Sequence, residues 1–407
     1  MSNTIYTMSK KTIKYILLVI CFTSVMALIW FKVFDQFWEV ENEDAIYELL
    51  DIDLNATNMK YILQWTSGST EPFKFMGKGQ DTFINNQCSY NNCYVTSDKN
   101  HLLSLSDFHV LLFHGPELYR ETYPLPTKRS VQQKYVFVSM ESSDYYPVCN
   151  DRYRDYFNWT WTYKLTSDLY YGYLVIRNDE GVVIGPKDDM HWMTVDEMKP
   201  IDDKLKSRLD GKNLAAAWFV SNCNAPSGRL DFGKQLKHEL EINYNMTLDI
   251  YGACGPKKCL RNSMKECLQM ISEKYYFYLS FENSFSEDYV TEKLLHALQN
   301  YAVPIVFGGA NYTRFMPDGI YLDGRKLGVK ALAQNMVNII NNKEEYYTFF
   351  KWHNHYSYHD PYDSSETNYY CQLCKRLNSE DFMETTVYDD FRRWWNPPRL
   401  RHRVCKT

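Results

Sequence analysis

A strand, a polar loop, a helix and a second strand are predicted in order between residues 276 and 309, and this order constrains the fold most. The apolar run YFYLSF (276–281) predicts a buried strand, and VPIVFGG (303–309) predicts another. Between them, apolar residues recur at helical spacing from about residue 286 to residue 300. Strands that alternate with helices indicate an α/β fold with a parallel sheet.

The same alternation extends over most of the chain. Other short apolar runs predict strands at 59–65, 108–113, 135–139, 172–176, 214–222 and 248–252, and a helix at 229–240. Residues 186–213 are charged and bounded by prolines, so they suit a crossover or linker. With 407 residues and no internal repeat, two unlike α/β halves are the simplest architecture. A ligand is then expected near the carboxyl ends of the strands.

The N-terminus predicts a membrane anchor. Residues 15–31 carry no charge, and residues 15–34 are about long enough to cross a bilayer, which takes ~20 residues. Lysines precede this stretch and acidic residues follow it, so a short cytoplasmic tail and a lumenal body are expected. No small-residue cleavage site follows the run, which favours an uncleaved anchor over a signal peptide.

Cysteines and glycosylation motifs agree with a lumenal body. Ten of the eleven cysteines lie beyond the predicted anchor, and this even number suggests disulfides whose pairing cannot be read from sequence. Asn-x-Ser/Thr motifs make four asparagines candidates for glycosylation: Asn55, Asn158, Asn245 and Asn311. Net charge is −5 with both signs interspersed, which does not suggest a nucleic-acid-binding protein.

The segment FENSFSEDYVTEKLL (281–295) concentrates polar chemistry at the junction of strand and helix. On a helical wheel, Tyr289, Glu292 and Lys293 fall on one face beside an apolar stripe. Ser284 and Glu287 fit the S-x-x-E capping box, so the alternative is a capped helix with a solvated polar face.

The position of this segment, directly after a predicted strand, suits its polar residues to binding a ligand. A helix that starts after a parallel strand directs free backbone N–H groups at whatever lies beyond the strand. A lysine there adds a charge for a phosphate, and a glutamate can accept two hydrogen bonds from a ribose diol. The chain has no glycine-rich phosphate loop at this position, so a nucleoside diphosphate in another type of site is favoured.

The segment FENS-x4-YVTEK, followed by VPIVFGG, resembles the donor-site signature of the α1,3-fucosyltransferases. Other segments resemble this family in the same order, over about residues 59 to 375: MESS (140–143), FNWTWTYKLTSD (157–168), VSNCN with Arg229, DIYGACG, FFKWH and CQLC. The extra cysteines resemble those of invertebrate members. The resemblance implies transfer of fucose from GDP-fucose to the 3-hydroxyl of a GlcNAc-containing glycan acceptor, with inversion at the anomeric carbon.

The resemblance also implies roles for single residues. Arg229 and Lys293 would hold the diphosphate, because cations stabilise the charge that develops on the leaving nucleotide. Glu292 would bind the ribose, Tyr289 would line the nucleotide pocket, and Asn283 would reach the fucose or the phosphates. The residue that would act as general base on the acceptor hydroxyl is Glu141.

The implied fold has two facing Rossmann-like domains behind one N-terminal transmembrane helix. The expected parts are a cytoplasmic tail (1–14), an anchor (15–34), a stem (35–58), an acceptor-side domain (59–205), a GDP-fucose-binding domain (206–350) and a tail that packs back on the acceptor domain (351–407). The expected location is the Golgi membrane, with a single-pass type II topology and the body in the lumen. Cys371 and Cys374 would bond to Cys88 and Cys93, with a local Cys88–Cys93 bridge as the alternative.

The implied mechanism requires no metal or other cofactor, because the two cations Arg229 and Lys293 would already bind the diphosphate of the donor. Asp51-Ile-Asp53 resembles the D-x-D motif of metal-dependent glycosyltransferases, but it falls in the expected stem. Three departures from the family pattern, at Ser143, Lys164 and Thr166, leave open a second hypothesis. This hypothesis is a membrane-anchored glycan- or nucleotide-binding relative with little or no activity. A glycosidase that uses Glu141 with Glu292 is less favoured, since plain glycosides need no cationic partners.

Overall fold

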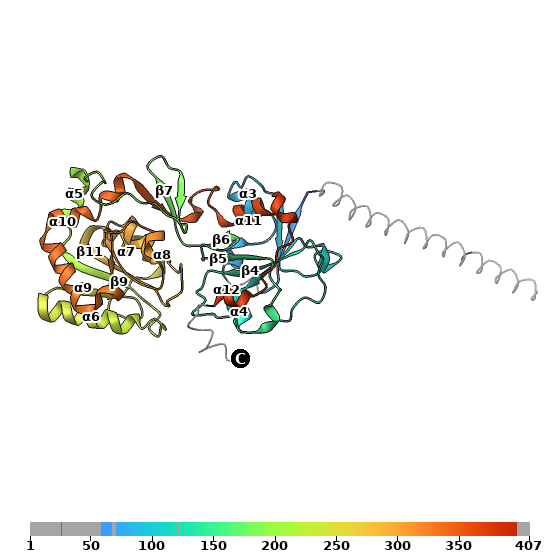
Figure 1. The fold of residues 1–407 in the computed structure, drawn as a ribbon, viewed down its shortest axis with the longest axis horizontal. Helices are drawn as coiled ribbons and strands as arrows, with labels where there is room; N and C mark the ends of the chain where they lie inside the picture. The colour runs from blue at the N-terminus through green and yellow to red at the C-terminus, as the bar shows by residue number, and fades with distance from the viewer. Residues whose placement is uncertain (1–25, 27–57, 67–70, 121–122, 397–407) are drawn as a thin grey trace, which may run out of the picture. The chain divides into compact units, whose positions relative to one another are not determined.

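A computed structural model describes residue 26 and residues 58–66, 71–120 and 123–396. Two separate sheets in the described region consist entirely of parallel strands (Figure 1). The predicted α/β class is therefore confirmed.

The first sheet has six strands in the order β2-β1-β3-β4-β5-β6. The strands are β1 (Lys60–Gln64), β2 (Cys93–Thr96), β3 (Val110–His114), β4 (Lys134–Ser139), β5 (Trp159–Thr162) and β6 (Leu169–Tyr170). Alternate residues of each strand face opposite sides, so Val110 and Leu112 belong to one hydrophobic cluster and Leu111 and Phe113 to another. Helices contribute to both clusters: α3 (Asp81–Asn85) and α11 (Tyr369–Leu377) to the first, and α4 (Gly115–Tyr119) and α12 (Phe391–Trp395) to the second.

The second sheet has five strands in the order β10-β9-β11-β12-β13. They are β9 (Leu214–Phe219), β10 (Leu248–Tyr251), β11 (Tyr275–Phe281), β12 (Val303–Phe307) and β13 (Leu322–Asp323). Helices α6 (Arg229–Tyr244) and α9 (Gly324–Asn341) pack together against one face through leucine and methionine side chains. Helices α7 (Met264–Lys274) and α8 (Glu292–Gln299) contact the strands as well, so the sheet lies between helical layers (Figure 1).

One predicted strand belongs to neither parallel sheet. The run at 172–176 overlaps β7 (Val175–Asn178), which pairs antiparallel with β8 (Val183–Gly185) and with β14 (Tyr356–His359). The apolar pattern shows that the run is buried but does not identify its partners. The predicted crossover at 186–213 is irregular up to α5 (Asp203–Asp210).

The predicted helix at 286–300 is too long at its start. Helix α8 begins only at Glu292, and Asp288 has a φ of 58°, which a right-handed helix does not allow. The predicted capping box is therefore wrong: Ser284 caps no helix, and its hydroxyl bonds to Ser142 and Asn283. Tertiary contacts thus determine the conformation of this segment, although its local sequence favours a helix cap.

The C-terminal part of the described chain returns to the first sheet. Tyr370 and Leu373 of α11 join the cluster on one face of that sheet. Cys88 is bonded to Cys371 and Cys93 to Cys374, which is the tie that the family resemblance implies. Cys223–Cys254 and Cys259–Cys267 form two further disulfides, which are local in sequence.

Removing the first of the two long-range disulfides is expected to lower the free energy of unfolding less than removing the second. They span 283 and 281 residues and lie side by side along α11, so either one alone keeps nearly the same loop closed. Replacing Cys88 and Cys371 by serine should lower the free energy of unfolding by about 2 kcal/mol, and replacing all four cysteines by about 5 kcal/mol more. Urea unfolding of both variants measures these costs, and two equal, additive costs would contradict the account.

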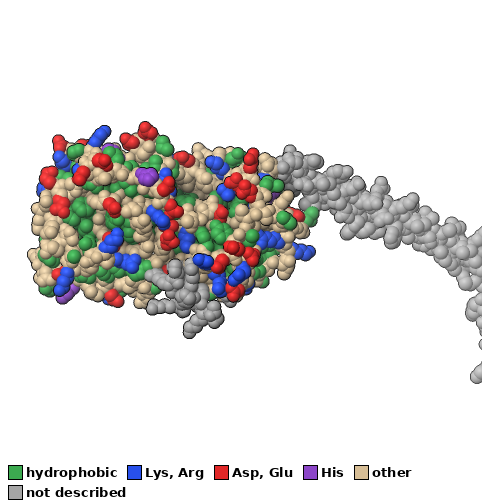
Figure 2. All heavy atoms as spheres, in the orientation of Figure 1, with side chains coloured by type: hydrophobic (Ala, Val, Ile, Leu, Met, Phe, Trp, Pro, Cys, Tyr) green, Lys and Arg blue, Asp and Glu red, His purple; other side chains and the backbone are tan. Residues whose placement is uncertain are grey.

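Several predictions concern residues outside the described ranges. The predicted anchor lies there except for Met26, as do the stem up to residue 57, the Asp51-Ile-Asp53 motif and Asn55. In the part of the chain that is described, no helix combines the length and the apolar character needed to span a bilayer. On the face shown in Figure 2, acidic and basic side chains intermingle, in agreement with the mixed charge of the sequence.

Candidate active site

A cleft of 540 Å³ lies at the carboxyl ends of strands β3, β4 and β11. We call it the Glu141 cleft. Its polar lining includes Glu141, which follows β4, and Asn283, which follows β11. The remaining lining residues are Glu71, His114, Pro116, Glu117, Arg120, Met140, Tyr146, Tyr173, Tyr289, Glu292 and Lys293. Both parallel sheets therefore contribute to one cleft, at the strand ends where α/β folds place their ligands.

A second cavity, of 220 Å³, lies at the carboxyl ends of β9 and β10. We call it the Arg229 pocket. Aromatic and polar side chains line it: Phe219, Val220, Ser221, Arg229, Tyr251, Gly252, Cys259, Met264, Tyr278, Glu292, Lys293 and His296. Glu292 and Lys293 line both cavities, so the two cavities adjoin at the start of α8.

Lys293 is held by acidic and hydroxyl groups at this junction. Its Nζ lies 3.2 Å from an oxygen of Glu282 and 3.1 Å from one of Glu292, and it donates to the Thr291 hydroxyl at 2.6 Å. Burial lowers the pKa of Lys293, but the two carboxylates outweigh it, so the net shift is upward and the ammonium stays charged. A fixed positive charge therefore faces both cavities.

Glu282 fixes the start of α8, and the sequence analysis missed this residue. Glu282 is buried, and its carboxylate accepts from the Thr291 backbone N–H at 2.8 Å and from the Thr291 hydroxyl at 3.0 Å. Burial raises the pKa of Glu282, while Lys293 lowers it. Glu282 is the acidic residue of the FENS segment (281–284), but an acidic residue directly after a strand also suits an exposed turn, so the sequence did not single it out.

Glu292 is an ionised acid at the mouth of both cavities. Its side chain is 48% exposed. Burial would raise its pKa, but Lys293 and His296 oppose this and hold the pKa at about 2. A carboxylate in this state accepts hydrogen bonds and does not donate them, as the predicted role toward a diol requires.

Glu141 has the opposite character. Burial raises its pKa, against the effects of Lys293 and of a hydrogen bond from the Tyr289 hydroxyl at 3.3 Å. A carboxylate with a raised pKa takes up a proton more readily than an exposed one. Glu141 and Glu292 thus differ in environment within one cleft, as an acid–base site requires.

Arg229 is anchored by hydrogen bonds to backbone carbonyl groups. One Nη donates to the carbonyl of Phe281 at 2.6 Å and the other to that of Asn222 at 3.4 Å, while Nε is buried without a partner among the described residues. Burial lowers the pKa of Arg229. Arg229 and Lys293 place two cations in one small pocket, which suits a ligand with two or more negative charges.

Two of the five predicted donor residues, Tyr289 and Asn283, line the Glu141 cleft but not the Arg229 pocket. Arg229, Glu292 and Lys293 share the Arg229 pocket, but Tyr289 lines the Glu141 cleft and packs edge-on against Tyr163. The family resemblance implied a place in the nucleotide pocket for Tyr289, and the helical wheel placed it on the same helix as Lys293, whereas α8 begins three residues after Tyr289. Asn283 lies in the Glu141 cleft with it.

Comparisons with known proteins bear on this arrangement. Two family models match the chain: "Fucosyltransferase, N-terminal" over residues 57–174 and "Glycosyltransferase family 10 (fucosyltransferase) C-term" over residues 209–394. The chain is 34% identical over 329 residues to alpha-(1,3)-fucosyltransferase C of Drosophila melanogaster, a match that covers 78% of this chain and 72% of that protein. The chain belongs to the fucosyltransferases of glycosyltransferase family 10.

The chain is also similar to a second curated protein and to a solved structure. Glycoprotein 3-alpha-L-fucosyltransferase A of Drosophila melanogaster is 30% identical over 336 residues, which cover 81% of this chain and 59% of that protein. A crystal structure of an alpha1,3-fucosyltransferase with GDP superposes with a TM-score of 0.48 at 15% identity, over 82% of this chain and 92% of that chain.

Three residues of this fucosyltransferase depart from the family pattern, and each has a different environment. Lys164 donates to the carbonyl of Trp394 at 2.6 Å, with its ammonium over two tryptophan rings, and Thr166 is exposed. Ser143 is buried between the two sheets' loops. None of the three lines the Glu141 cleft or the Arg229 pocket.

Ser143 belongs to a set of hydrogen bonds that joins the loop after β4 to the loop after β11. We call this set the serine latch. Ser142 and Ser284 share a hydrogen bond of 2.5 Å, and Ser143 and Ser286 one of 3.3 Å. Asp144 accepts from the backbone N–H of Phe285 and donates its own N–H to Ser286, each at 3.0 Å. The latch directly follows Glu141 in one loop and Asn283 in the other, so it fixes their separation.

Replacing Ser142 and Ser286 together by alanine is expected to lower kcat about tenfold, because small misplacements of reacting groups are costly. Affinity for GDP should not change, since neither serine lines the Arg229 pocket. Steady-state kinetics and calorimetry of GDP binding separate the two quantities. Ser104→Ala, which removes a serine hydrogen bond remote from both cavities, is the control. Unchanged kcat in the double variant would contradict the positioning role.

Two predicted glycosylation sites are accessible and one is not. Asn245 and Asn311 are exposed. Asn158 is 4% exposed, its oxygen accepts from the Tyr135 N–H, and its amide donates to the carbonyl of Thr386 at 2.7 Å. The structure therefore argues against a glycan on Asn158, whose motif serves packing instead.

Proposed function

We propose that the chain transfers fucose from GDP-fucose to the 3-hydroxyl of a GlcNAc residue in a glycoprotein glycan. The observation that supports this most is the junction of the two cavities at Lys293. A cationic pocket of nucleotide-binding character opens there into a cleft that holds a carboxyl group of raised pKa. One cavity then binds the donor and the other the acceptor.

The donor's diphosphate binds near Arg229 and Lys293, and Glu292 accepts hydrogen bonds from the ribose. As the bond from fucose to phosphate breaks, negative charge develops on GDP, and the fixed ammonium of Lys293 stabilises it. Glu282 holds that ammonium in place at 3.2 Å. No residue other than these need supply positive charge for the leaving group.

The acceptor's hydroxyl attacks the anomeric carbon from the Glu141 cleft. Glu141 takes the hydroxyl proton as the new C–O bond forms, so a neutral alcohol becomes an effective nucleophile. Attack from the side opposite the leaving GDP inverts the configuration at that carbon. No covalent bond between enzyme and sugar is needed.

The proposal extends to the architecture and the location of the chain. Two separate parallel sheets that share one cleft support two facing Rossmann-like domains. The uncharged stretch at 15–31, with lysines before it, supports a single-pass type II protein of the Golgi membrane with its body in the lumen. The disulfides support the same compartment.

The first test is donor-dependent and needs no acceptor to be known in advance. GDP should raise the melting temperature of the protein, since a ligand that binds only the folded state stabilises it. GDP-fucose should then release GDP in the presence of a GlcNAc-bearing glycan. Stabilisation by GDP without release of GDP across a panel of glycans would instead favour a binding protein without transferase activity.

A further inference from the structure

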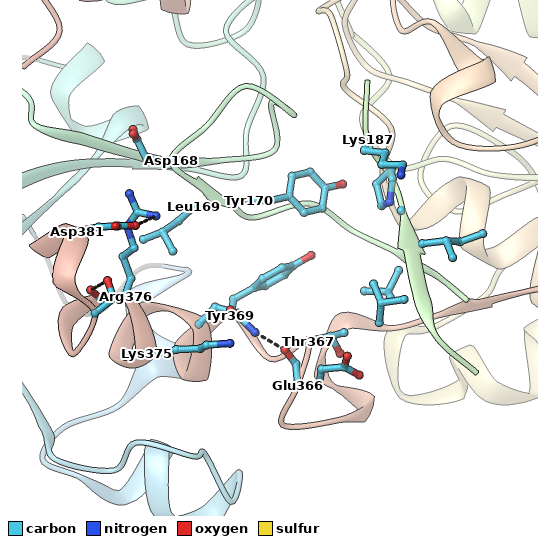
Figure 3. A pocket seen from close by; sticks show the side chains of 17 residues that line it. Asp168, Leu169, Tyr170, Lys187, Glu366, Thr367, Tyr369, Lys375, Arg376 and Asp381 are labelled. Carbon is cyan, nitrogen blue, oxygen red and sulfur yellow. Dashed lines mark hydrogen bonds and ion pairs between the residues drawn. The ribbon is translucent and has the colours of Figure 1, made fainter. Parts of the chain in front are cut away.

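A third cavity, of 710 Å³, lies apart from the two cavities of the active site. Figure 3 shows it between β6, the β7–β8 hairpin and helix α11, and we call it the Tyr369 groove. Its lining residues are Asp168, Leu169, Tyr170, Val175, Val183, Ile184, Gly185, Pro186, Lys187, Glu366, Thr367, Tyr369, Gln372, Lys375, Arg376, Ser379 and Asp381. None of them lines the Glu141 cleft or the Arg229 pocket.

The two sides of the groove differ in chemistry. The hairpin side is mostly apolar, with Val183, Ile184 and Pro186, and two tyrosine rings lie opposite. Rings Tyr170 and Tyr369 pack edge to face, with centroids 6.4 Å apart, and Figure 3 shows both pointing toward the hairpin. Apolar and aromatic walls of this kind suit the C–H faces of sugar rings.

The α11 side is polar and balanced in charge. Arg376 pairs with Asp381 at 3.0 Å, and Glu366 pairs with Arg177 at 2.9 Å, so these acids are already neutralised. Lys375 is exposed, with no ion pair among the described residues. Three basic and three acidic side chains line the groove, which favours neither a polyanion nor a polycation.

One buried polar group lacks a partner. Tyr369 is 3% exposed and lines the groove, and its hydroxyl has no hydrogen-bond partner among the described residues. A buried hydroxyl in this state is unfavourable unless a bound polar group or a water satisfies it. The volume of the groove falls within the range of about 300–1,000 Å³ that holds ligands of several rings.

We infer that the Tyr369 groove binds an uncharged oligosaccharide, namely a part of the acceptor glycan distant from the reacting GlcNAc. This inference rests on the proposed transfer to a glycan. Residues 169–175 connect the two sites, because Tyr170 lines the groove while Tyr173 lines the Glu141 cleft. A branched glycan thus has one branch in the cleft and another in the groove, and the groove selects extended acceptors over short ones.

The test compares a short and a branched acceptor on the full chain. Lys187→Ala/Lys375→Ala removes two hydrogen-bond donors, and Val183→Trp fills the groove. Each should raise KM for a branched N-glycan about tenfold, as loss of a hydrogen bond from a charged group implies, and leave kcat unchanged. KM for a GlcNAc-containing disaccharide should stay as in the wild type. Lys234→Ala, an exposed lysine on α6 away from all three cavities, is the control.

Equal effects on the two acceptors, or no effect on either, would overturn the inference. A wild-type chain that transfers fucose to neither acceptor would count against the proposed function instead. In that case, saturation-transfer NMR with the branched glycan alone decides about the groove. Binding that is lost in Val183→Trp supports it, whereas binding that persists, or binding only to a peptide carrier, contradicts it.

Discussion

Replacing Lys293 by alanine is expected to lower the rate of fucose transfer about 10²–10³-fold, the usual effect of removing one charge-stabilising donor. Lys293 lines both cavities, at the junction where we propose that the leaving group forms. Its loss should also weaken the binding of GDP, because the diphosphate carries its charge in the ground state as well. Turnover with GDP-fucose and calorimetry with GDP measure the two effects.

Replacing Lys293 by alanine should also lower the stability of the fold, so a control variant must separate this loss from the loss of activity. Lys293 neutralises Glu282, which is 2% exposed in its side chain, so the alanine variant leaves a buried carboxylate without its ion-pair partner. We expect a loss of at most about 3 kcal/mol, because Thr291 still donates to Glu282 and the acid can take up a proton. Glu282→Gln/Lys293→Met removes both charges and should fold more stably while remaining inactive. Wild-type turnover in either variant would remove Lys293 from the donor site.

Replacing Glu141 by glutamine is expected to lower kcat about 10²–10⁴-fold, the range that a general base contributes. GDP affinity should stay unchanged, because Glu141 does not line the Arg229 pocket. The amide keeps the shape of the side chain and can still accept from Tyr289, but it cannot take the acceptor proton. Retained transfer in Glu141→Gln would remove Glu141 as the base.

The pH dependence of kcat/KM in the wild type offers a second test of the role of Glu141. Glu141 must be ionised to accept a proton, so kcat/KM falls as the pH drops through its pKa. Burial raises that pKa above the ordinary 4.5, so the acid limb of the profile should lie above pH 4.5. Any residual activity of Glu141→Gln should lack this limb, whereas Lys234→Ala should retain it.

The sequence predicted the parallel strands better than the loops between them. Strands such as β11 and β12 are continuous apolar runs bounded by polar residues, a pattern that local sequence determines. The start of α8 was wrong by about six residues, because Ser284 and Ser286 bond to residues 142 and 143 of the other sheet's loop. A capping motif cannot reveal partners more than a hundred residues away.

In the candidate site, too, the sequence predicted some residues and missed those whose role depends on long-range contacts. Arg229, Glu292 and Lys293 were predicted to act together, and the structure places them in one pocket. Glu282 was missed, although it stands next to Asn283, because its importance comes from complete burial against Thr291 and Lys293. The Tyr369 groove could not be foreseen either, since its walls come from three segments that sequence patterns do not bring together.

The most direct test of the central claim is the structure of the product. The purified chain, supplied with GDP-fucose and a panel of GlcNAc-terminated and branched glycans, should release GDP and yield a fucosylated glycan. Mass spectrometry and NMR of that product should place fucose on the 3-hydroxyl of a GlcNAc, with the anomeric configuration opposite to that in the donor. Free fucose without a glycoside product, or a product that retains the donor's configuration, would contradict direct transfer assisted by Glu141.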